Sequence, residues 1–280
     1  MSEAAGYKLV HLSPAASRLG AVFARPKTIA VVCVVVLAAL GWFTLGLQAA
    51  SISAFDVLCR AFSGSGPVDA ASIAVIAAMW GAMTLAMMLP SAAPMILTYA
   101  EIADTAARKG EPVVSPFMIA AGFTAVWFGF AVAASLAQLV LTRAALLESS
   151  MASASGLFSG AIFITAGAYQ FSALKHACLT QCQNPFPFFF ANWKTTPRGV
   201  FRLGVKQGLY CLGCCWAMML VMFAVGVMNV IWMAALGIVM TIEKIGTGKR
   251  FAYAVGVGLI AIGIAFVLSA FAAHWPGRII

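Results

Sequence analysis

Long apolar runs separated by short polar segments are the dominant pattern of the chain. Several runs have about 18 residues or more, the length that crosses the ~30 Å hydrocarbon layer as an α-helix. The pattern predicts an all-α, polytopic membrane protein with about seven transmembrane helices. We expect these helices at about Thr28–Leu47, Ala71–Tyr99, Pro116–Leu141 and Gly156–Leu174, two more between Val205 and Thr241 that turn near Gly226–Asn229, and a last one at Phe251–Ala272.

The polar segments predict how the chain is divided. Residues 1–26 are expected to form a cytoplasmic tail, residues 27–272 a single transmembrane domain, and residues 273–280 a C-terminal tail. The longest polar insertion, residues 175–204, falls inside the transmembrane domain. We expect this insertion to lie on the cytoplasmic side or in the membrane interface.

The basic residues predict which side of the membrane each segment faces. With a cytoplasmic N-terminus, seven helices place fourteen of the 17 Lys and Arg residues in inner segments. Only Arg60, Arg143 and Arg278 are then outside. Short cytoplasmic loops of membrane proteins carry an excess of Lys and Arg. The split therefore predicts an N-terminus inside, a C-terminus outside, and a multi-pass protein of the cell inner (plasma) membrane.

Composition agrees with this location. The chain is 63% hydrophobic and 9% charged, against roughly 45–50% and 25% in soluble domains. The net charge of +9 does not indicate nucleic acid, because the basic residues lie between apolar runs and no nucleic-acid motif appears. The lipid bilayer is the expected partner. We do not expect an enzyme, since no nucleotide loop, paired catalytic carboxylates or Ser/His/Asp set is present.

Five of the seven cysteines fall in two clusters that this topology places near the inner face. Cys178 and Cys182 follow the fourth helix, and Cys211, Cys214 and Cys215 begin the fifth. Disulfides are disfavoured on the reducing cytoplasmic side, so free thiols or metal ligands are expected. Thiolate and thioether ligands are soft and select Cu(I) over hard cations.

Methionines lie on the same helices. Met218 continues the thiol face of the fifth helix at helical spacing, and Met83 and Met87 share a face of the second. Ordinary core packing is the alternative, because methionine fills apolar cores. His176 adjoins the first cluster, but on an ideal helix it points about 200° away from Cys178 at ~100° per residue. It joins the site only if the helix has ended there.

Prolines shape two of these regions. Pro90 and Pro94 interrupt the second apolar run, and proline frees backbone carbonyls one turn back. Pro185 and Pro187 forbid a continuing helix in the insertion, where phenylalanines make a free loop unfavourable. We expect this segment to lie against the membrane and bring the two thiol clusters together. Four carboxylates at inner loop ends are expected to be solvated, namely Glu101, Asp104, Glu111 and Glu243.

Three sequence runs carry a family resemblance. They are Met79-Trp80-x-x-Met83-x-x-x-Met87-Met88-Leu89-Pro90, Tyr169-Gln170-x-x-x-x-Lys175-His176-x-Cys178-x-x-x-Cys182, and Gly208-x-Tyr210-Cys211-x-Gly213-Cys214-Cys215-Trp216. Between about Ile73 and Ile264 the chain resembles the predicted metal-binding integral membrane proteins, also described as membrane copper chaperones for copper oxidases such as tyrosinases. The resemblance implies metal binding in the membrane, copper as the favoured metal, and likely ligand positions at His176, Cys178, Cys182, Cys211, Cys214 and Cys215.

Copper handling is therefore the expected function. The protein would bind Cu(I) and pass it to a copper-dependent oxidase or a soluble copper carrier, or across the bilayer. Two alternatives stay open: a membrane thiol/quinone oxidoreductase that uses the vicinal thiols, and a helical subunit with a structural zinc site of four ligands. The sequence does not fix the oligomeric state.

Overall fold

The computed structural model describes residues 70–144, 155–227, 229–245 and 248–274, with a few helical positions between 32 and 46. The regular elements in these ranges are all α-helices, which confirms the all-α prediction. The first predicted helix falls largely outside the described residues. The helices are α4 (Ala70–Arg108), α5 (Pro116–Arg143), α6 (Gly156–Tyr169), α7 (Ala173–Gln183), α8 (Pro185–Asn192), α9 (Pro197–Val225), α10 (Val230–Lys244) and α11 (Gly248–His274).

Side-chain caps fix where several helices begin. Ser115, Ser172, Thr196 and Asn229 each precede a helix and accept a hydrogen bond from a backbone N–H of its first turn. These N–H groups have no partner within the helix, so a capping oxygen stabilises the start by about 1 kcal/mol. The polar segments of the sequence therefore set the helix boundaries.

Among the described residues, four helices are long and apolar enough to cross a membrane: α4, α5, α9 and α11. The count becomes five if α6 and α7, which meet at a bend of 63°, form one broken span. α10 has 15 residues, fewer than the roughly 17–25 of most transmembrane helices. The structure thus shows four or five candidate spans where the sequence predicted seven.

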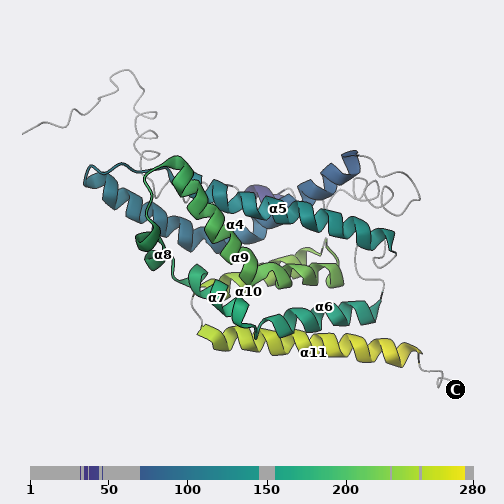
Figure 1. Cartoon of the computed structure of the whole chain (residues 1–280). Helices are drawn as coiled ribbons and strands as arrows, with labels where there is room; N and C mark the ends of the chain where they lie inside the picture. The colour runs from purple at the N-terminus through teal and green to yellow at the C-terminus, as the bar shows by residue number, and fades with distance from the viewer. Residues whose placement is uncertain are drawn as a thin grey trace, which may run out of the picture.

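Two pairs of helices run side by side, α4 with α5 and α6 with α11 (Figure 1). α4 and α5 lie along one side, α6 and α11 along the opposite side, and α9 and α10 between them. α7 and α8 pack at one end of this bundle, against α9 and α4 respectively. The core between α4, α5 and α9 is apolar and contains the buried residues Trp80, Trp127 and Met219.

Glycines allow the closest helix contacts. A Cβ added at Gly122 of α5 would lie 2.2 Å from the carbonyl oxygen of Phe201 in α9. A Cβ at Gly160 of α6 would lie 2.8 Å from the carbonyl oxygen of Gly263 in α11. Small residues at such contacts let two backbones approach, as is common in membrane helix pairs. α9, which carries three of the cysteines, is thereby held tightly against α5.

α11 packs closely against α6 and leaves much of its remaining surface exposed. Only 17% of its most apolar stretch is buried, and Val257, Leu268 and Phe271 are exposed. Exposed apolar surface of this extent is unusual in soluble monomers. It is the expected outer surface of a helix that faces lipid.

α4 is helical through Pro90 and Pro94, so the second predicted helix is one element. Pro90 cannot donate to the carbonyl of Ala86 four residues earlier. The indole N–H of Trp42 donates to that oxygen instead, at 3.0 Å. A side chain from another segment thus satisfies the acceptor, which is how membrane helices tolerate proline.

Candidate metal site

The three cysteines of α9 form a buried row. Cys211, Cys214 and Cys215 are each 1% exposed, and the Sγ atoms of Cys214 and Cys215 are 3.3 Å apart. The Cys214 thiol also contacts the carbonyl oxygen of Cys211 at 3.2 Å. All five cysteines in the described ranges are free thiols, in agreement with the expectation that no disulfide framework is present.

α7 brings the other two cysteines to this row. Cys182 lines the same small cavity as Cys211 of α9. A Cβ added to Gly213 would lie only 2.6 Å from the Sγ of Cys178. The absence of a side chain at Gly213 therefore leaves space for this sulfur. The bend between α6 and α7 turns α7 toward α9. The helices that carry the two cysteine clusters therefore lie side by side, and a single shared site stays a prediction.

The segment between the clusters is a short helix. α7 ends at Gln183, and Pro185 begins α8 at a position where proline needs no N–H partner. Phe188 and Phe189 are buried, and the Tyr99 ring of α4 stacks on Trp193 with ring centres 5.6 Å apart. These aromatic contacts attach α8 to the end of α4 and so fix the chain path from Cys182 back to α9.

A small cavity of about 20 Å³ lies beside two of the thiols. Its lining includes Cys182 and Cys211, with the thioether residue Met95 and the amide residue Gln207. The Oε1 atom of Gln207 is buried and has no hydrogen-bond partner among the residues that the structure describes. Buried polar atoms are normally paired, so this oxygen marks the cavity as a place that accepts a donor or a small ion.

Two neighbouring charged residues at the end of α10 are also buried. Glu243 was expected to be solvated, and this expectation is wrong: its side chain is 2% exposed. Its two carboxylate oxygens accept from Lys175 Nζ of α7 at 2.8 and 3.0 Å. Gln183 donates to the Glu243 carbonyl oxygen at 2.7 Å. The pair joins α7 to α10, because a buried charge is tolerated only with such a partner.

Lys244 points to the thiols. Its Nζ is 2.9 Å from Cys211 Sγ and donates to Ser91 Oγ at 2.7 Å. The residue is 6% exposed. A positive group is therefore fixed against one of the candidate ligands.

His176 does not join the thiols. α7 continues through this position, so the histidine points away from Cys178 as helix geometry requires. Its ring packs edge-on against Tyr253 of α11 with centres 5.2 Å apart. The buried Nε2 atom has no hydrogen-bond partner.

The candidate methionines have separate contacts. Met218 Sδ accepts a hydrogen bond from Gln170 Nε2 at 2.9 Å. Met87 lies near Gly237 of α10 and, with Trp42, lines a cavity that contains no thiol. Met83 is fully buried in the core. These positions are consistent with core packing, whereas Met95, which the sequence analysis omitted, lines the same cavity as Cys182 and Cys211.

Within the described ranges, no three His, Cys, Asp or Glu side chains already have the arrangement of a metal site. The donor set is nevertheless suited to a soft ion, since sulfur predominates and carboxylates are absent from the lining of the small cavity. Zinc prefers four ligands in a closed tetrahedron, whereas Cu(I) accepts fewer. The residues present therefore fit Cu(I) better than zinc.

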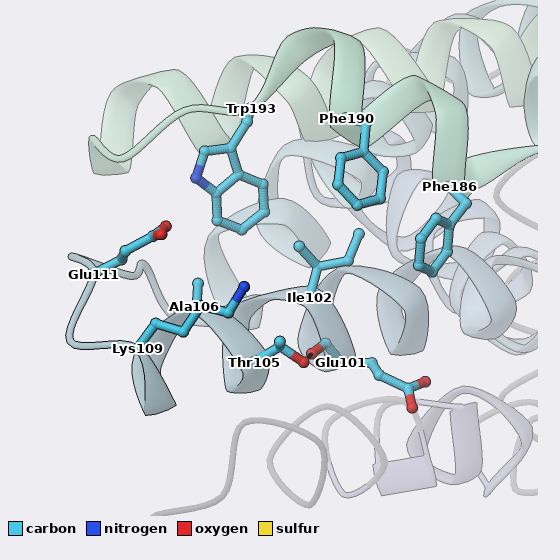
Figure 2. Close-up of a pocket in the computed structure, with 9 residues that line it drawn as sticks. All are labelled: Glu101, Ile102, Thr105, Ala106, Lys109, Glu111, Phe186, Phe190 and Trp193. Atoms are coloured by element: carbon cyan, nitrogen blue, oxygen red, sulfur yellow. Dashed lines mark hydrogen bonds between the residues drawn. The ribbon is translucent and has the colours of Figure 1, made fainter.

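A larger cavity, of about 390 Å³, lies elsewhere (Figure 2). Phe186, Phe190 and Trp193 form one wall, and Glu101 and other residues of α4 face them. No thiol lines it, so its size does not make it the metal site.

Sequence reasoning missed Lys175, Gln207 and Met95, and it left a role open for Glu243 and Lys244 because they directly follow an apolar run. The signal for Met95 was its place two further turns along the Met79, Met83, Met87 row. Gln207 gave no comparable signal.

Comparison with known proteins gives the family. A family model described as "PpoB2: Copper chaperone" matches residues 77–266, more than half of the 280-residue chain. Searches of curated proteins and of solved structures gave no match. The matched region contains the thiols of α7 and α9 and the buried charges of α10. The chain therefore belongs to the PpoB2 copper chaperone family.

Proposed function

We propose that this protein is an integral membrane copper handler that binds Cu(I) at the thiols of α7 and α9. One observation carries the proposal: Cys182 of α7 and Cys211 of α9, which belong to two cysteine clusters about 30 residues apart in sequence, line the same small cavity. Soft sulfur donors in an apolar, buried setting bind Cu(I) in preference to hard cations. Membership in a copper chaperone family supports the same metal.

Burial differs between the two groups of thiols. Cys178 and Cys182 are partly exposed, whereas the three cysteines of α9 are buried. We assign entry and exit of the ion to α7 and retention to α9. Copper would reach a copper-dependent oxidase or a soluble copper carrier by exchange of these soft ligands, and no catalytic step is required.

The membrane topology is part of the proposal. We place seven spans in the inner membrane, with the N-terminus inside and the C-terminus outside. The C-terminal end of α4 and the N-terminal parts of α9 and α11 carry or adjoin most of the basic residues in the described ranges: Arg108, Lys109, Lys194, Arg198, Arg202, Lys206, Lys249 and Arg250. Arg143 lies at the opposite end of α5. This distribution supports a cytoplasmic position for the thiol end.

Elemental analysis tests the copper site. The protein is purified in detergent, supplied with Cu(I) under reducing conditions, and compared with a variant in which Cys211, Cys214 and Cys215 are serine. The wild type is expected to retain copper and the variant to lose most of it. A variant with serine at Cys33 and Cys59 removes two thiols outside both clusters and is the matched control. Equal copper in all three proteins would reject the thiol site.

Labelling with an impermeant thiol reagent tests the topology. Single cysteines placed near Asp69 and near the C-terminus should react in intact cells, and one placed at Lys194 should react only after lysis. Labelling of the Lys194 position in intact cells would reverse the proposed orientation.

A further inference from the structure

Lys244 is a buried cation without a buried anion of its own. Within the part of the chain that the structure describes, no carboxylate pairs with it; its neighbours are the Ser91 hydroxyl and the Cys211 sulfur. The adjacent Glu243 cannot neutralise it, because both carboxylate oxygens are taken by Lys175. The charge of Lys244 is therefore directed at the thiol site.

The position of Lys244 also favours a retained charge. The residue is in the last turn of α10, where the partial negative charge of the helix end stabilises a cation. It lines the small cavity together with Cys182 and Cys211. An ion bound by these two sulfurs would therefore lie close to the Lys244 ammonium group.

Electrostatic repulsion between two cations grows in proportion to the charge of each and is weakly screened in a buried site. At the same position, a divalent ion is repelled by Lys244 twice as strongly as a monovalent ion. Two thiolates, one monovalent ion and one ammonium group also sum to zero charge, which is the least costly state for an apolar interior. A divalent ion on the same two thiolates leaves one positive charge uncompensated.

We infer that Lys244 is a specificity-determining residue that makes the thiol site select monovalent over divalent soft ions. The inference rests on the function proposed above, and it adds the reason why a site of cysteines would exclude zinc. The thiols supply the preference for soft metals, and Lys244 supplies the preference for single charge.

The test measures the affinities of the purified full-length protein for Ag(I), a redox-stable monovalent ion, and for Zn(II). Lys244→Met removes both the charge and the hydrogen-bond donors, Lys244→Gln removes the charge and keeps donors, and Lys244→Arg keeps the charge. The exposed neighbour Lys249→Met is the control for a general change in net charge. Circular dichroism and elution as a single species in detergent verify that each variant is folded.

The ratio of Zn(II) to Ag(I) affinity should rise by about tenfold or more in Lys244→Met and Lys244→Gln, a change that corresponds to about 1.4 kcal/mol. It should stay near the wild-type value in Lys244→Arg and Lys249→Met. An unchanged ratio in the Gln variant, or a rise confined to the Met variant, would overturn the role of charge. If the wild type binds neither ion through its cysteines, the proposed function fails first, and the two failures are distinguishable.

Discussion

The Sγ of Cys178 occupies the space that a Cβ on Gly213 would need, only 2.6 Å from where that atom would be. The glycine of the Cys-Leu-Gly-Cys-Cys run therefore has a defined role: it lets α7 place a thiol directly on the α9 backbone. Tyr169, the last residue of α6, also binds α9 at this glycine, since its hydroxyl donates to the Gly213 carbonyl oxygen.

Replacement of Gly213 by alanine should move Cys178 away from the α9 thiols. Overpacking of this kind typically costs about 1–3 kcal/mol, and we expect weaker copper binding in a protein that still folds. Gly258→Ala in α11 is the matched control, because a Cβ there meets no atom within 4 Å. Copper titration of both variants measures the effect; equal affinities would show that Cys178 does not need its present position.

The two thiol groups should behave as one site in a double-mutant cycle. Serine at Cys178 and Cys182, or at Cys211, Cys214 and Cys215, should each remove most high-affinity copper binding, with little further loss in the combined variant. Affinities must be measured at one pH, because protons compete with metal for thiolates. Additive losses, or two ions bound per chain, would instead indicate two sites.

Removing one member of the Lys175–Glu243 pair should lower the stability more than replacing both members by uncharged residues. Lys175→Met leaves the Glu243 carboxylate without its partner, and loss of one member of a buried pair typically costs about 3–5 kcal/mol. Adding Glu243→Gln should recover much of this loss, since no unpaired charge then remains. Unfolding in detergent with increasing denaturant compares the wild type with these two variants. A double variant no more stable than Lys175→Met would contradict the ion-pair account.

The Trp42 hydrogen bond should stabilise the protein because Pro90 leaves a carbonyl of α4 without its helical donor. Trp42→Phe removes the donor to the Ala86 carbonyl, and an unsatisfied buried acceptor costs about 1–3 kcal/mol. In a Pro90→Ala background the helix supplies its own N–H to that carbonyl, so the same Trp42 change should cost less. Thermal unfolding of the four proteins measures the difference. Identical costs in both backgrounds would show that the indole hydrogen bond contributes nothing.

Much of the fold could be predicted from the sequence because apolar length and helical period are local properties. α4, α5, α6, α10 and α11 follow the expected runs, whereas α7 and α8 are helices within the predicted insertion and α9 begins at Pro197, before the expected start at Val205. α10 was harder to judge: its 15 residues are apolar, but they are too few to fulfil the length criterion for a span.

The sequence predicted the thiols of the candidate site, but it did not predict that the neighbouring charges are buried. The spacing of Cys211, Cys214 and Cys215 fixes their shared face, and the aromatic insertion indicated that Cys182 would return to them. The burial of Glu243 and Lys244 depends on which helices surround the end of α10, and no local pattern contains that information. The carbonyl that Pro90 leaves without a helical donor shows the same limit of local patterns, since Trp42, which donates to it, is distant in sequence.

The ion pair between α7 and α10 also has a consequence for how the protein is made. α7 leaves the ribosome well before α10, so Lys175 has no counterion until Glu243 has been synthesised. α10 is short and ends in two charges, and it therefore needs the earlier helices already in place to receive it. The surroundings of the thiols are thus completed only when α10 is in place, because its Lys244 then meets the sulfur of Cys211.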